Sequence, residues 1–416
     1  MYRPHTTCRA CGYAFHGAGG NRNPNEKLVS VFNLGVQPLA NDFCKSGQER
    51  QGYAPLEVLF CEKCRLAQLS VVVKPEVLYK NYAYVTSDSE TMRKHFAALV
   101  SDLTAEQPAG PVVEIGSNNG ALLKHLRAEG FINSVGIEPA ENLAREANAD
   151  GVLTINDYLD SESAAKAKAD CGGKVSFVLA RHCFCHADSW VKMIDGFEAL
   201  ADKDTLIAIE VPYLPDQIAN VSFDQCYHEH LSYLSLSAMA ALLEDSVLRM
   251  HKVIKYPIHG GCVLIMLRPL NSGRDPHPSV EQFMGQENIT ADTWREFAAE
   301  AHAQIHKLGL LIKSLRDAGK TVCGYGASAK STVWVNACKF SRKDISFITD
   351  TTKGKWHTTS PGTDIPITDP GALLRELPDY CILFAWNFAS EILAKESLYR
   401  EKGGKFIIPV PHIKIV

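Results

Sequence analysis

Four neighbouring side chains in the stretch FDQCYHEHLSYLS (223–235) could handle a proton or a metal ion: Tyr227, His228, Glu229 and His230. A phenol, a carboxylate and an imidazole can each hold a proton or polarise a carbonyl oxygen. His228 and His230 are two residues apart, and on a helix such side chains diverge by about 200°, so they cannot share an ion. The stretch is therefore either an acid/base site or an ordinary polar loop, and what the rest of the chain binds must decide between them.

Four cysteines near the start have the spacing of metal ligands. Cys8/Cys11 and Cys61/Cys64 form two CxxC pairs, and the first residues, MYRPHTTCRACG, lack the apolar core of a signal peptide. We therefore expect a cytoplasmic protein, in which paired cysteines are metal ligands more often than disulfides. Two such pairs complete a tetrahedral zinc site without an open position, which predicts a structural metal. A redox role is less favoured, because neither pair begins a helix of a thioredoxin-like unit.

The overall composition limits the possible partners. The chain has 416 residues, 46% of them hydrophobic, and a formal net charge of -4. This length predicts two or three domains. The net charge gives no electrostatic reason to expect nucleic acid or an anionic membrane as a partner, and no apolar run reaches the roughly 18 residues of a membrane span. The sequence does not indicate the oligomeric state, and it is compatible with a monomer.

The stretch VVEIGSNNGALLKHL (112–126) reads as a strand, a tight glycine loop and a helix. Its E-x-G-x-x-x-G spacing differs from the dinucleotide motif G-x-G-x-x-G. It matches the first motif of class I methyltransferases, which use S-adenosylmethionine. A carboxylate at the end of the next strand can accept both ribose hydroxyls, and a later Asn-Asp pair falls where the adenine amine would be read. The predicted donor-binding residues are Glu114, Gly116, Asn118, Gly120, Glu138, Pro139, Asn156 and Asp157. The alternative is that the glycines are only turn residues and Glu138 a charge at a helix N-terminus.

Three domains are predicted from the order of the patterns. Helices and strands alternate after the cysteine-containing segment, which indicates a parallel, doubly wound α/β sheet. The polar, Pro/Gly-rich segment NSGRDPHPS (271–279) is typical of a linker. A long helix and a second, smaller α/β unit follow it. We expect a zinc-binding domain over 1–75, a class I methyltransferase domain over 76–270 and a smaller, Rossmann-like α/β domain over 271–416.

Over nearly its whole length the chain resembles the nucleotide-sugar C-methyltransferases that act on dTDP-4-keto-deoxysugars. The resemblance is strongest to the 3-C-methyltransferases of branched-chain sugar biosynthesis. It rests on the paired CxxC motifs, YAYVTSDS (82–89), EIGSNNG, EVPYL (210–214), FDQCYHEHLSY, HGG (259–261), GYGASAK (324–330), PGTDIPI (361–367) and AWNF (385–388). It implies that zinc is structural, that S-adenosylmethionine is the methyl donor and that a dTDP-linked 4-ketosugar is the acceptor.

The resemblance also implies roles for residues in the stretch 223–235. Tyr227 and His230 would form an acid/base pair that removes the proton at C3 of the sugar, next to the C4 ketone, to give an enolate. Glu229 would hold a sugar hydroxyl, and His186 would be a second contact to the sugar. A tyrosine base would need a strongly lowered pKa, whereas histidine titrates near neutrality, so we favour His230 as the base. Tyr82, Tyr84 and Ser87 would line the cleft of the sugar nucleotide.

A second glycine loop, GYGASAK, precedes a helix, and Asp350 ends the strand that follows it. Taken alone this could be a site for NAD, although the third glycine is missing. The resemblance assigns this domain to the sugar nucleotide, with Ser328 and Lys330 meeting the diphosphate at a helix N-terminus. The alternative is that Lys330 is an ordinary lysine on a helix face.

Two departures from the family pattern bear on the substrate. Relatives usually carry D-x-N-P-x-K-Q-G where this chain reads DTTKGKWHTTSPGT (350–363), and many carry asparagine where RHCFCH has Arg181 and His182. Both concern the nucleotide base and the sugar substituents more than the reaction.

Two other functions account for the sequence less well. An O- or N-methyltransferase acting on a nucleotide sugar would leave the Tyr/His pair poorly explained. A non-catalytic zinc-containing binding protein would not need the intact EIGSNNG loop, Glu138 or YHEH.

Overall fold

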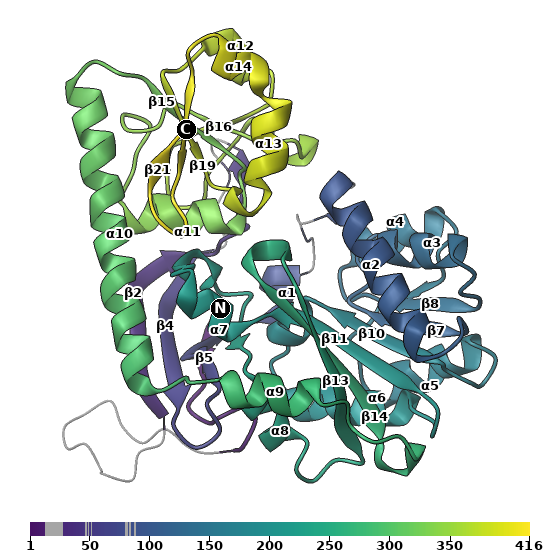
Figure 1. Ribbon diagram of the computed structural model, residues 1–416. Helices are drawn as coiled ribbons and strands as arrows, with labels where there is room; N and C mark the ends of the chain where they lie inside the picture. Colours follow the sequence, from purple (N-terminus) through teal and green to yellow (C-terminus); the bar gives the residue numbers. More distant parts are fainter. Residues whose placement is uncertain are drawn as a thin grey trace.

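The computed structural model contains three packed groups of secondary structure (Figure 1). It describes residues 1–12, 28–45, 48, 50, 52–79, 82, 85–86 and 89–416. Among these residues, no helix has both the length and the apolar content needed to cross a membrane.

The N-terminal unit is a four-stranded antiparallel sheet in the order β12-β5-β4-β2. Its strands are β2 (Leu28–Pro38), β4 (Tyr53–Cys61), β5 (Ala67–Leu69) and β12 (Ser232–Tyr233). A two-stranded ribbon of β1 (Tyr2–Pro4) and β6 (Val71–Val73) lies beside it. Strand β12 comes from the stretch 223–235, with Ser232 paired to Gln68. The candidate acid/base stretch therefore completes the N-terminal sheet.

The central unit contains a seven-stranded sheet in the order β13-β14-β11-β10-β7-β8-β9. The strands are β7 (Val112–Ile115), β8 (Ser134–Ile137), β9 (Thr154–Ile155), β10 (Phe177–Arg181), β11 (Leu206–Pro212), β13 (Leu248–Tyr256) and β14 (Cys262–Pro269). The five from β7 to β11 are parallel, and β13 and β14 form an antiparallel hairpin at one edge. Residues of β7 and β8 are buried throughout, as helices on both faces require. The expected doubly wound sheet is confirmed.

Helices cover the two faces of this sheet (Figure 1). They are α2 (Glu90–Glu106), α3 (Ala121–Ala128), α4 (Glu141–Ala149), α5 (Ser161–Asp170) and α6 (Trp190–Leu200). Shorter helices are α1 (Pro75–Tyr79), α7 (Leu214–Ala219), α8 (Leu236–Leu242) and α9 (Ser279–Gln286), with 3-10 turns η1 (Phe184–His186), η2 (Phe223–Gln225), η3 (Ile258–Gly260) and η4 (Leu270–Ser272).

The C-terminal unit is a smaller α/β sheet in the order β18-β16-β15-β19-β20-β21. The strands are β15 (Val322–Tyr325), β16 (Ile348–Thr349), β18 (Ile367–Thr368), β19 (Tyr380–Leu383), β20 (Lys405–Ile408) and β21 (Lys414–Ile415), of which only β21 is antiparallel. The helices are α11 (Ala329–Ala337), α12 (Ala372–Glu376), α13 (Ala389–Lys395) and α14 (Ser397–Glu401), with turns η5 (Lys353–Lys355) and η6 (Trp386–Phe388). A short ribbon, β3 (Cys44–Lys45) with β17 (Thr358–Thr359), ties this unit to the N-terminal one.

The long helix α10 (Ala291–Asp317) connects the N-terminal and C-terminal units (Figure 1). One face of α10 is apolar, because its buried residues are spaced three, four or seven positions apart along the helix. They include Trp294, Phe297, Ala301, Leu308 and Ile312. At one end Phe297 packs against Phe32 of β2, with ring centroids 5.5 Å apart. Because this face also packs on the C-terminal sheet, the two units share one hydrophobic core.

A buried carboxylate joins the stretch 223–235 to the C-terminal unit. The Oδ2 atom of Asp224, in η2, accepts hydrogen bonds from the indole nitrogens of Trp334 (3.0 Å) and Trp386 (2.7 Å). The Asp224 side chain is fully buried, and the ring of Phe223 lies 4.4 Å from that of Trp334. The stretch is thus fixed at one end to the C-terminal unit and at the other to the N-terminal sheet.

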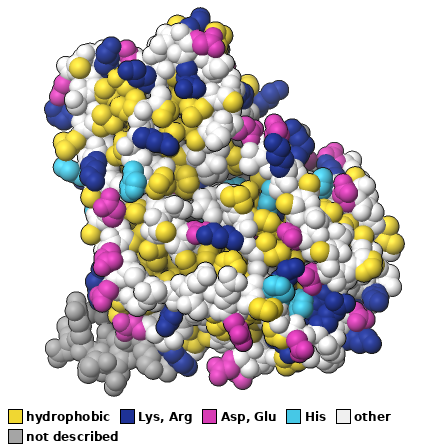
Figure 2. Space-filling view, in the orientation of Figure 1, with side chains coloured by type: hydrophobic (Ala, Val, Ile, Leu, Met, Phe, Trp, Pro, Cys, Tyr) yellow, Lys and Arg dark blue, Asp and Glu magenta, His cyan; other side chains and the backbone are white. Residues whose placement is uncertain are grey.

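The outline of the molecule is notched between the lobe that carries α2 to α4 and the lobe that carries α12 to α14 (Figure 2). On the described part of the face in Figure 2, basic and acidic side chains are interspersed. This distribution agrees with the small net charge of -4.

We expect Asp224→Ala to lower the free energy of unfolding by about 2–5 kcal/mol, because two buried indole N–H groups lose their acceptor. Urea denaturation followed by tryptophan fluorescence measures this. The control Asp292→Ala removes an exposed carboxylate paired with Arg295 on α10 and should change the free energy by less than about 1 kcal/mol. Equal unfolding midpoints for the two variants would show that the Asp224 contacts do not stabilise the fold.

Candidate active site

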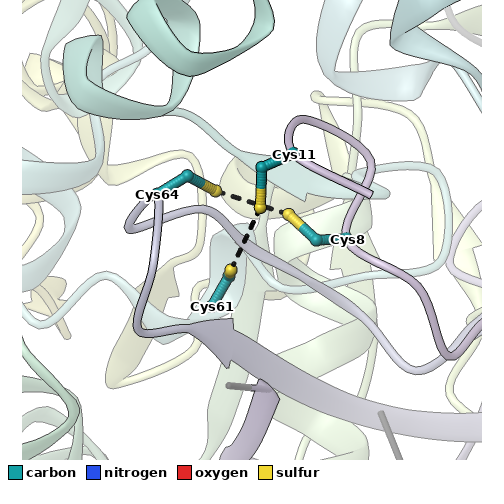
Figure 3. Close-up of side chains that lie close together, drawn as sticks. All are labelled: Cys8, Cys11, Cys61 and Cys64. Atoms are coloured by element: carbon teal, nitrogen blue, oxygen red, sulfur yellow. Dashed lines mark hydrogen bonds between the residues drawn. The ribbon is translucent and has the colours of Figure 1, made fainter. Parts of the chain in front are cut away.

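Two turns bring the four N-terminal cysteines together, as Figure 3 shows. The sulfur atoms of Cys8 and Cys64 are 3.4 Å apart, those of Cys11 and Cys61 are 3.6 Å apart, and all four lie within 4.8 Å of one another. Zn–S bonds of about 2.3 Å in a tetrahedron place sulfurs about 3.8 Å apart. The four thiols therefore fit a Zn²⁺ ion with no position left for a substrate, as expected from the sequence.

The first cysteine turn also contacts the candidate acid/base stretch. Arg9, between Cys8 and Cys11, is buried, and its Nη1 atom donates to the backbone oxygen of Leu231 at 3.3 Å. Its backbone N–H donates to the side-chain oxygen of Gln68 at 2.9 Å. Since Leu231 follows His230 directly, the zinc-bearing turn helps to fix the position of the histidine.

The loop between β7 and α3 has the conformation that its glycines predict. Gly116 and Gly120 have φ angles of 64° and 73°, and Asn118 between them has φ of 53°. A Cβ atom on Gly116 would lie 2.7 Å from the Cβ of Cys183, so the loop after β10 packs directly on this backbone. Only glycine satisfies both the left-handed backbone and the close approach.

Glu138, directly after β8, is oriented by two backbone amides. Its Oε2 accepts from the N–H of Asn118 and its Oε1 from the N–H of Ala140, both at 2.8 Å. Burial raises the pKa of Glu138, although both amides oppose this. A carboxylate has about four acceptor positions, so Glu138 could accept two further hydrogen bonds, as the predicted contact with two ribose hydroxyls would require.

Glu114, in β7, has a buried oxygen that lacks a partner. Its Oε2 makes no hydrogen bond among the described residues, and the closest cation is Arg181, with Nη1 3.9 Å from Oε1. Burial raises the pKa of Glu114 to about 8, against the effect of Arg181. The ammonium group of the donor's methionine part would supply the missing partner. The chemistry of this end of the sheet therefore fits S-adenosylmethionine.

Both residues of the predicted Asn-Asp pair are exposed. Asn156 donates its amide hydrogens to the backbone oxygens of Glu138 (2.8 Å) and Pro139 (3.1 Å). One oxygen of Asp157 accepts from the N–H of Tyr158 at 2.8 Å. Asn156 thus contacts the backbone that carries Glu138, and both side chains reach the surface.

Tyr227 and His230 are in direct contact. The tyrosine hydroxyl lies 2.5 Å from Nε2 of His230, and Nδ1 of His230 lies 2.8 Å from the backbone oxygen of Gln225. A carbonyl oxygen only accepts, so Nδ1 carries the proton and Nε2 accepts from the phenol. Burial, followed by the field of His186, lowers the pKa of His230 well below its usual value. The imidazole is therefore neutral, and its Nε2 carries no proton.

Glu229 lies beside this pair in a buried position. Asn41 donates to its Oε2 at 3.0 Å, and burial raises the pKa of Glu229 to about 7. By contrast, His228 turns toward the N-terminal sheet, with Nε2 3.2 Å from the backbone oxygen of Ala54. Glu229 and His228 therefore contact two different residues of the N-terminal unit, Asn41 and Ala54.

A row of rings leads away from His230. The centroid of His186 is 5.2 Å from that of His230, and Tyr79 stacks on His186 at 6.1 Å. The ring of Tyr82 meets Tyr79 edge-on at 5.4 Å. Nε2 of His186 is buried without a hydrogen bond among the described residues, and burial lowers its pKa to about 3. Of the other predicted cleft residues, Tyr84 and Ser87 lie outside the described part of the chain.

The two residues predicted to meet the diphosphate have other contacts. The hydroxyl of Ser328 caps α11 by accepting from the N–H of Ser331 at 3.3 Å. Nζ of Lys330 donates to Asn387 at 3.2 Å and lies 4.6 Å above the ring of Trp386. Burial lowers the pKa of Lys330, and Asp224 opposes the shift. Lys330 thus packs beside Trp386, one of the two tryptophans that donate to Asp224.

A buried ionic cluster that we did not predict joins β10 and β11 to α2. Glu210 of β11 contacts His95 and His182 at 2.7 Å each and Arg181 at 3.7 Å. Burial opposes ionisation of Glu210, yet Arg181 and the two histidines hold its pKa well below the usual value. A glutamate inside the apolar strand LIAIEVP was the only signal in the sequence.

Three family models match the chain in succession. They are a zinc binding domain over residues 24–79, a methyltransferase domain over 89–253 and a C-methyltransferase C-terminal domain over 257–411. The C-methyltransferase NovU of Streptomyces niveus is 34% identical over 426 residues, which span 100% of this chain and 98% of that protein.

Solved structures with a similar fold include two methyltransferases. Magnesium protoporphyrin IX methyltransferase from Synechocystis PCC 6803 with bound SAM is 16% identical and has a TM-score of 0.32 over 45% of this chain and 88% of its own. A SAM-dependent methyltransferase from Anabaena variabilis ATCC 29413 is 13% identical, with a TM-score of 0.37 over 44% of this chain and 87% of its own.

We expect Cys61→Ser to lose the bound zinc, from about one ion per chain to near zero, because the site has no spare ligand. The thermal midpoint should fall with it, since structural zinc contributes directly to folding. Elemental analysis of the purified protein gives the metal content. Cys338→Ser, a change far from the cluster in sequence and on α11's end, should keep the zinc. Full zinc content in Cys61→Ser would contradict the four-thiolate assignment.

We expect Glu138→Gln to weaken binding of S-adenosylmethionine about 10- to 100-fold, because a charged acceptor of two hydrogen bonds is lost. In the unmodified protein, affinity should fall as the pH drops through the pKa of Glu138. Because burial raises this pKa, the loss begins at a higher pH than for an ordinary glutamate. Titration calorimetry measures both effects. The exposed Glu141→Gln serves as the control, and equal affinities for the two variants would rule out the ribose role.

Proposed function

The chain belongs to the C-methyltransferase family, and from this premise we propose that it methylates C3 of a nucleotide-linked 4-keto-deoxysugar through an enolate. It is an S-adenosylmethionine-dependent C-methyltransferase. The proposal therefore concerns the acceptor and the way in which its carbon becomes a nucleophile. The observation that carries it is the 2.5 Å contact between the Tyr227 hydroxyl and Nε2 of a neutral His230.

The Tyr227–His230 pair suits the removal of a proton from carbon. A C–H bond next to a ketone is acidic enough to lose its proton to a positioned base when the carbonyl oxygen is polarised. In the proposed reaction Nε2 of His230 takes the proton from C3, while the electron pair moves into the C3–C4 bond and onto the ketone oxygen. The hydroxyl of Tyr227 turns from Nε2 to that oxygen and donates a hydrogen bond to it.

The methyl group comes from S-adenosylmethionine, which supplies an electrophilic carbon to the nucleophilic C3. Glu114, Glu138 and the Gly116–Gly120 loop would hold the donor, with Asp157 toward the adenine. The packing of Cys183 on Gly116 brings the loop that contains His186 against the donor loop. This arrangement supports a short path between the acid/base pair and the donor site.

Glu229 suits a contact to a sugar hydroxyl. With a pKa of about 7, it exists partly as the acid near neutrality and can donate as well as accept. His186, whose buried Nε2 has no hydrogen-bond partner within the described part of the chain, is the second group proposed to face the sugar. The rings of Tyr79 and Tyr82 extend this surface toward the cleft.

The diphosphate is proposed to lie at the N-terminus of α11. Backbone N–H groups at such a terminus favour anions, and Lys330 adds a cation close by. Since its Nζ contacts Asn387 and Trp386, we assign it a long-range electrostatic role toward the substrate. The resemblance favours dTDP as the nucleotide and branched-chain deoxysugar biosynthesis as the setting.

We expect His230→Asn to abolish exchange of the C3 hydrogen of a dTDP-4-ketosugar in deuterium oxide without methyl donor, and to slow methyl transfer about 10²- to 10⁴-fold. Proton NMR follows the exchange. Tyr227→Phe keeps the base and should retain slow exchange. His306→Asn, on an exposed face of α10, should match the unmodified enzyme.

Two outcomes would contradict this assignment. Normal exchange in His230→Asn would remove His230 as the base. Absence of C3 exchange in the unmodified enzyme with every ketosugar nucleotide would favour methylation of oxygen or nitrogen.

A further inference from the structure

Three side chains that can bind a metal ion meet at the candidate active site from two segments of the chain. Cys185 and His186 lie in the turn η1, and His230 lies in the stretch 223–235. One ligand atom from each, a sulfur and two ring nitrogens, lies within 4.8 Å of the other two. Around Zn²⁺ such atoms are about 3.4–3.6 Å apart, so a shift of about 1 Å would close the set on an ion.

His230 makes the hydrogen bond that orients a metal-binding imidazole. Its Nδ1 donates to the backbone oxygen of Gln225 at 2.8 Å, which leaves the lone pair on Nε2. Histidines that bind a metal ion commonly donate their other ring nitrogen to a carbonyl or a carboxylate in this way. The hydroxyl of Tyr227 lies 2.5 Å from Nε2, so an ion there takes the place of this hydrogen bond.

His186 supplies a second nitrogen. Its Nε2 is buried and makes no hydrogen bond within the described part of the chain, and its ring centroid is 5.2 Å from that of His230. Burial lowers the pKa of His186 to about 3, so the ring is neutral, as a metal ligand must be. A buried polar atom without a partner costs about 1–3 kcal/mol, and a bound ion would remove this cost.

Cys185 makes the set selective for an ion that prefers sulfur. Its side chain is buried, and its sulfur lies 3.5 Å from the backbone oxygen of His182. Burial raises the pKa of the thiol to about 12, so Cys185 is uncharged when no ion is bound. A sulfur and two imidazole nitrogens suit Zn²⁺ and Co²⁺, whereas Mg²⁺ and Ca²⁺ prefer oxygen ligands.

We propose that Cys185, His186 and His230 form a second, inhibitory metal site that takes Zn²⁺ or a similar divalent cation. The ion binds the sulfur of Cys185 and Nε2 of both histidines, and the thiol proton passes to the solvent. Tyr227 loses its hydrogen bond to His230, whose Nε2 no longer has a lone pair for a proton from carbon. With three protein ligands the site is weaker than the four-cysteine cluster, so it fills only when zinc is in excess. The inhibition rests on the proposed function, whereas the binding of the ion does not.

Cobalt tests the binding, because a thiolate on Co²⁺ gives a charge-transfer band in the near ultraviolet. The zinc-loaded protein, free of excess metal, is titrated with cobalt chloride, and elemental analysis checks that the structural zinc stays bound. We expect about one Co²⁺ per chain, accompanied by the band. Cys185→Ser should lose the band, and His186→Asn should weaken Co²⁺ binding about 10-fold or more. Cys183→Ser is the matched control in the same loop, because the sulfur of Cys183 contacts the backbone oxygen of Ile115, and it should keep the band.

Zinc chloride tests the inhibition. In the unmodified enzyme, C3 exchange and methyl transfer should both fall as the second site fills. Cys185→Ser should match the unmodified enzyme without added zinc, because Cys185 takes no part in the proposed reaction. It should need about 10-fold more zinc for the same inhibition.

Three outcomes would overturn the inference. They are the absence of bound Co²⁺ beyond the structural zinc, a charge-transfer band of unchanged strength in Cys185→Ser, and equal sensitivity to zinc in Cys185→Ser and the unmodified enzyme. If Co²⁺ binds as expected while the unmodified enzyme neither exchanges nor methylates any ketosugar, the metal site stands and the proposed function fails.

Discussion

The geometry of the candidate active site depends on the burial of one short stretch, residues 223–235, against all three units. Asp224 accepts two indole hydrogen bonds from the C-terminal unit. At the other end, strand β12 joins the N-terminal sheet, and the backbone oxygen of Leu231 accepts from Arg9 in the zinc-bearing turn. A buried carboxylate and a buried carbonyl must keep their partners. Tyr227 and His230 therefore stay in place only while the three units stay together.

The second constraint is the removal of water from titratable groups. Burial keeps His186 and His230 neutral and raises the pKa of Glu229 to about 7. Each change favours the uncharged form, as desolvation requires. Glu210 keeps its charge, because Arg181 and two histidines surround it. The site thus combines neutral proton-handling groups with a carboxylate whose charge is compensated by a cation, so no isolated ion is buried there.

Local patterns predicted the parts of the site whose geometry is local. The two CxxC turns, the Gly116 loop and Glu138 each need only a few consecutive residues in one conformation, and the structure forms them as expected. The sequence did not predict side-chain contacts between residues that are far apart along the chain. Lys330 sits at a helix N-terminus in the sequence, yet its Nζ contacts Asn387 and Trp386, more than fifty residues away. Nothing in the residues around Glu210 indicated a cluster with His95.

The sequence by itself predicted the cluster of four cysteines, the doubly wound sheet and the conformation of the Gly116–Gly120 loop, because each depends on the spacing and backbone conformation of a few consecutive residues. Family membership followed from motifs spread over the whole chain. Only the tertiary structure decided which ring nitrogen of His230 carries the proton. It also decided that His228 turns away from His230 and that His182 contacts Glu210. Those contacts join segments far apart in sequence, and the burial that sets their charge states exists only once the three units have packed.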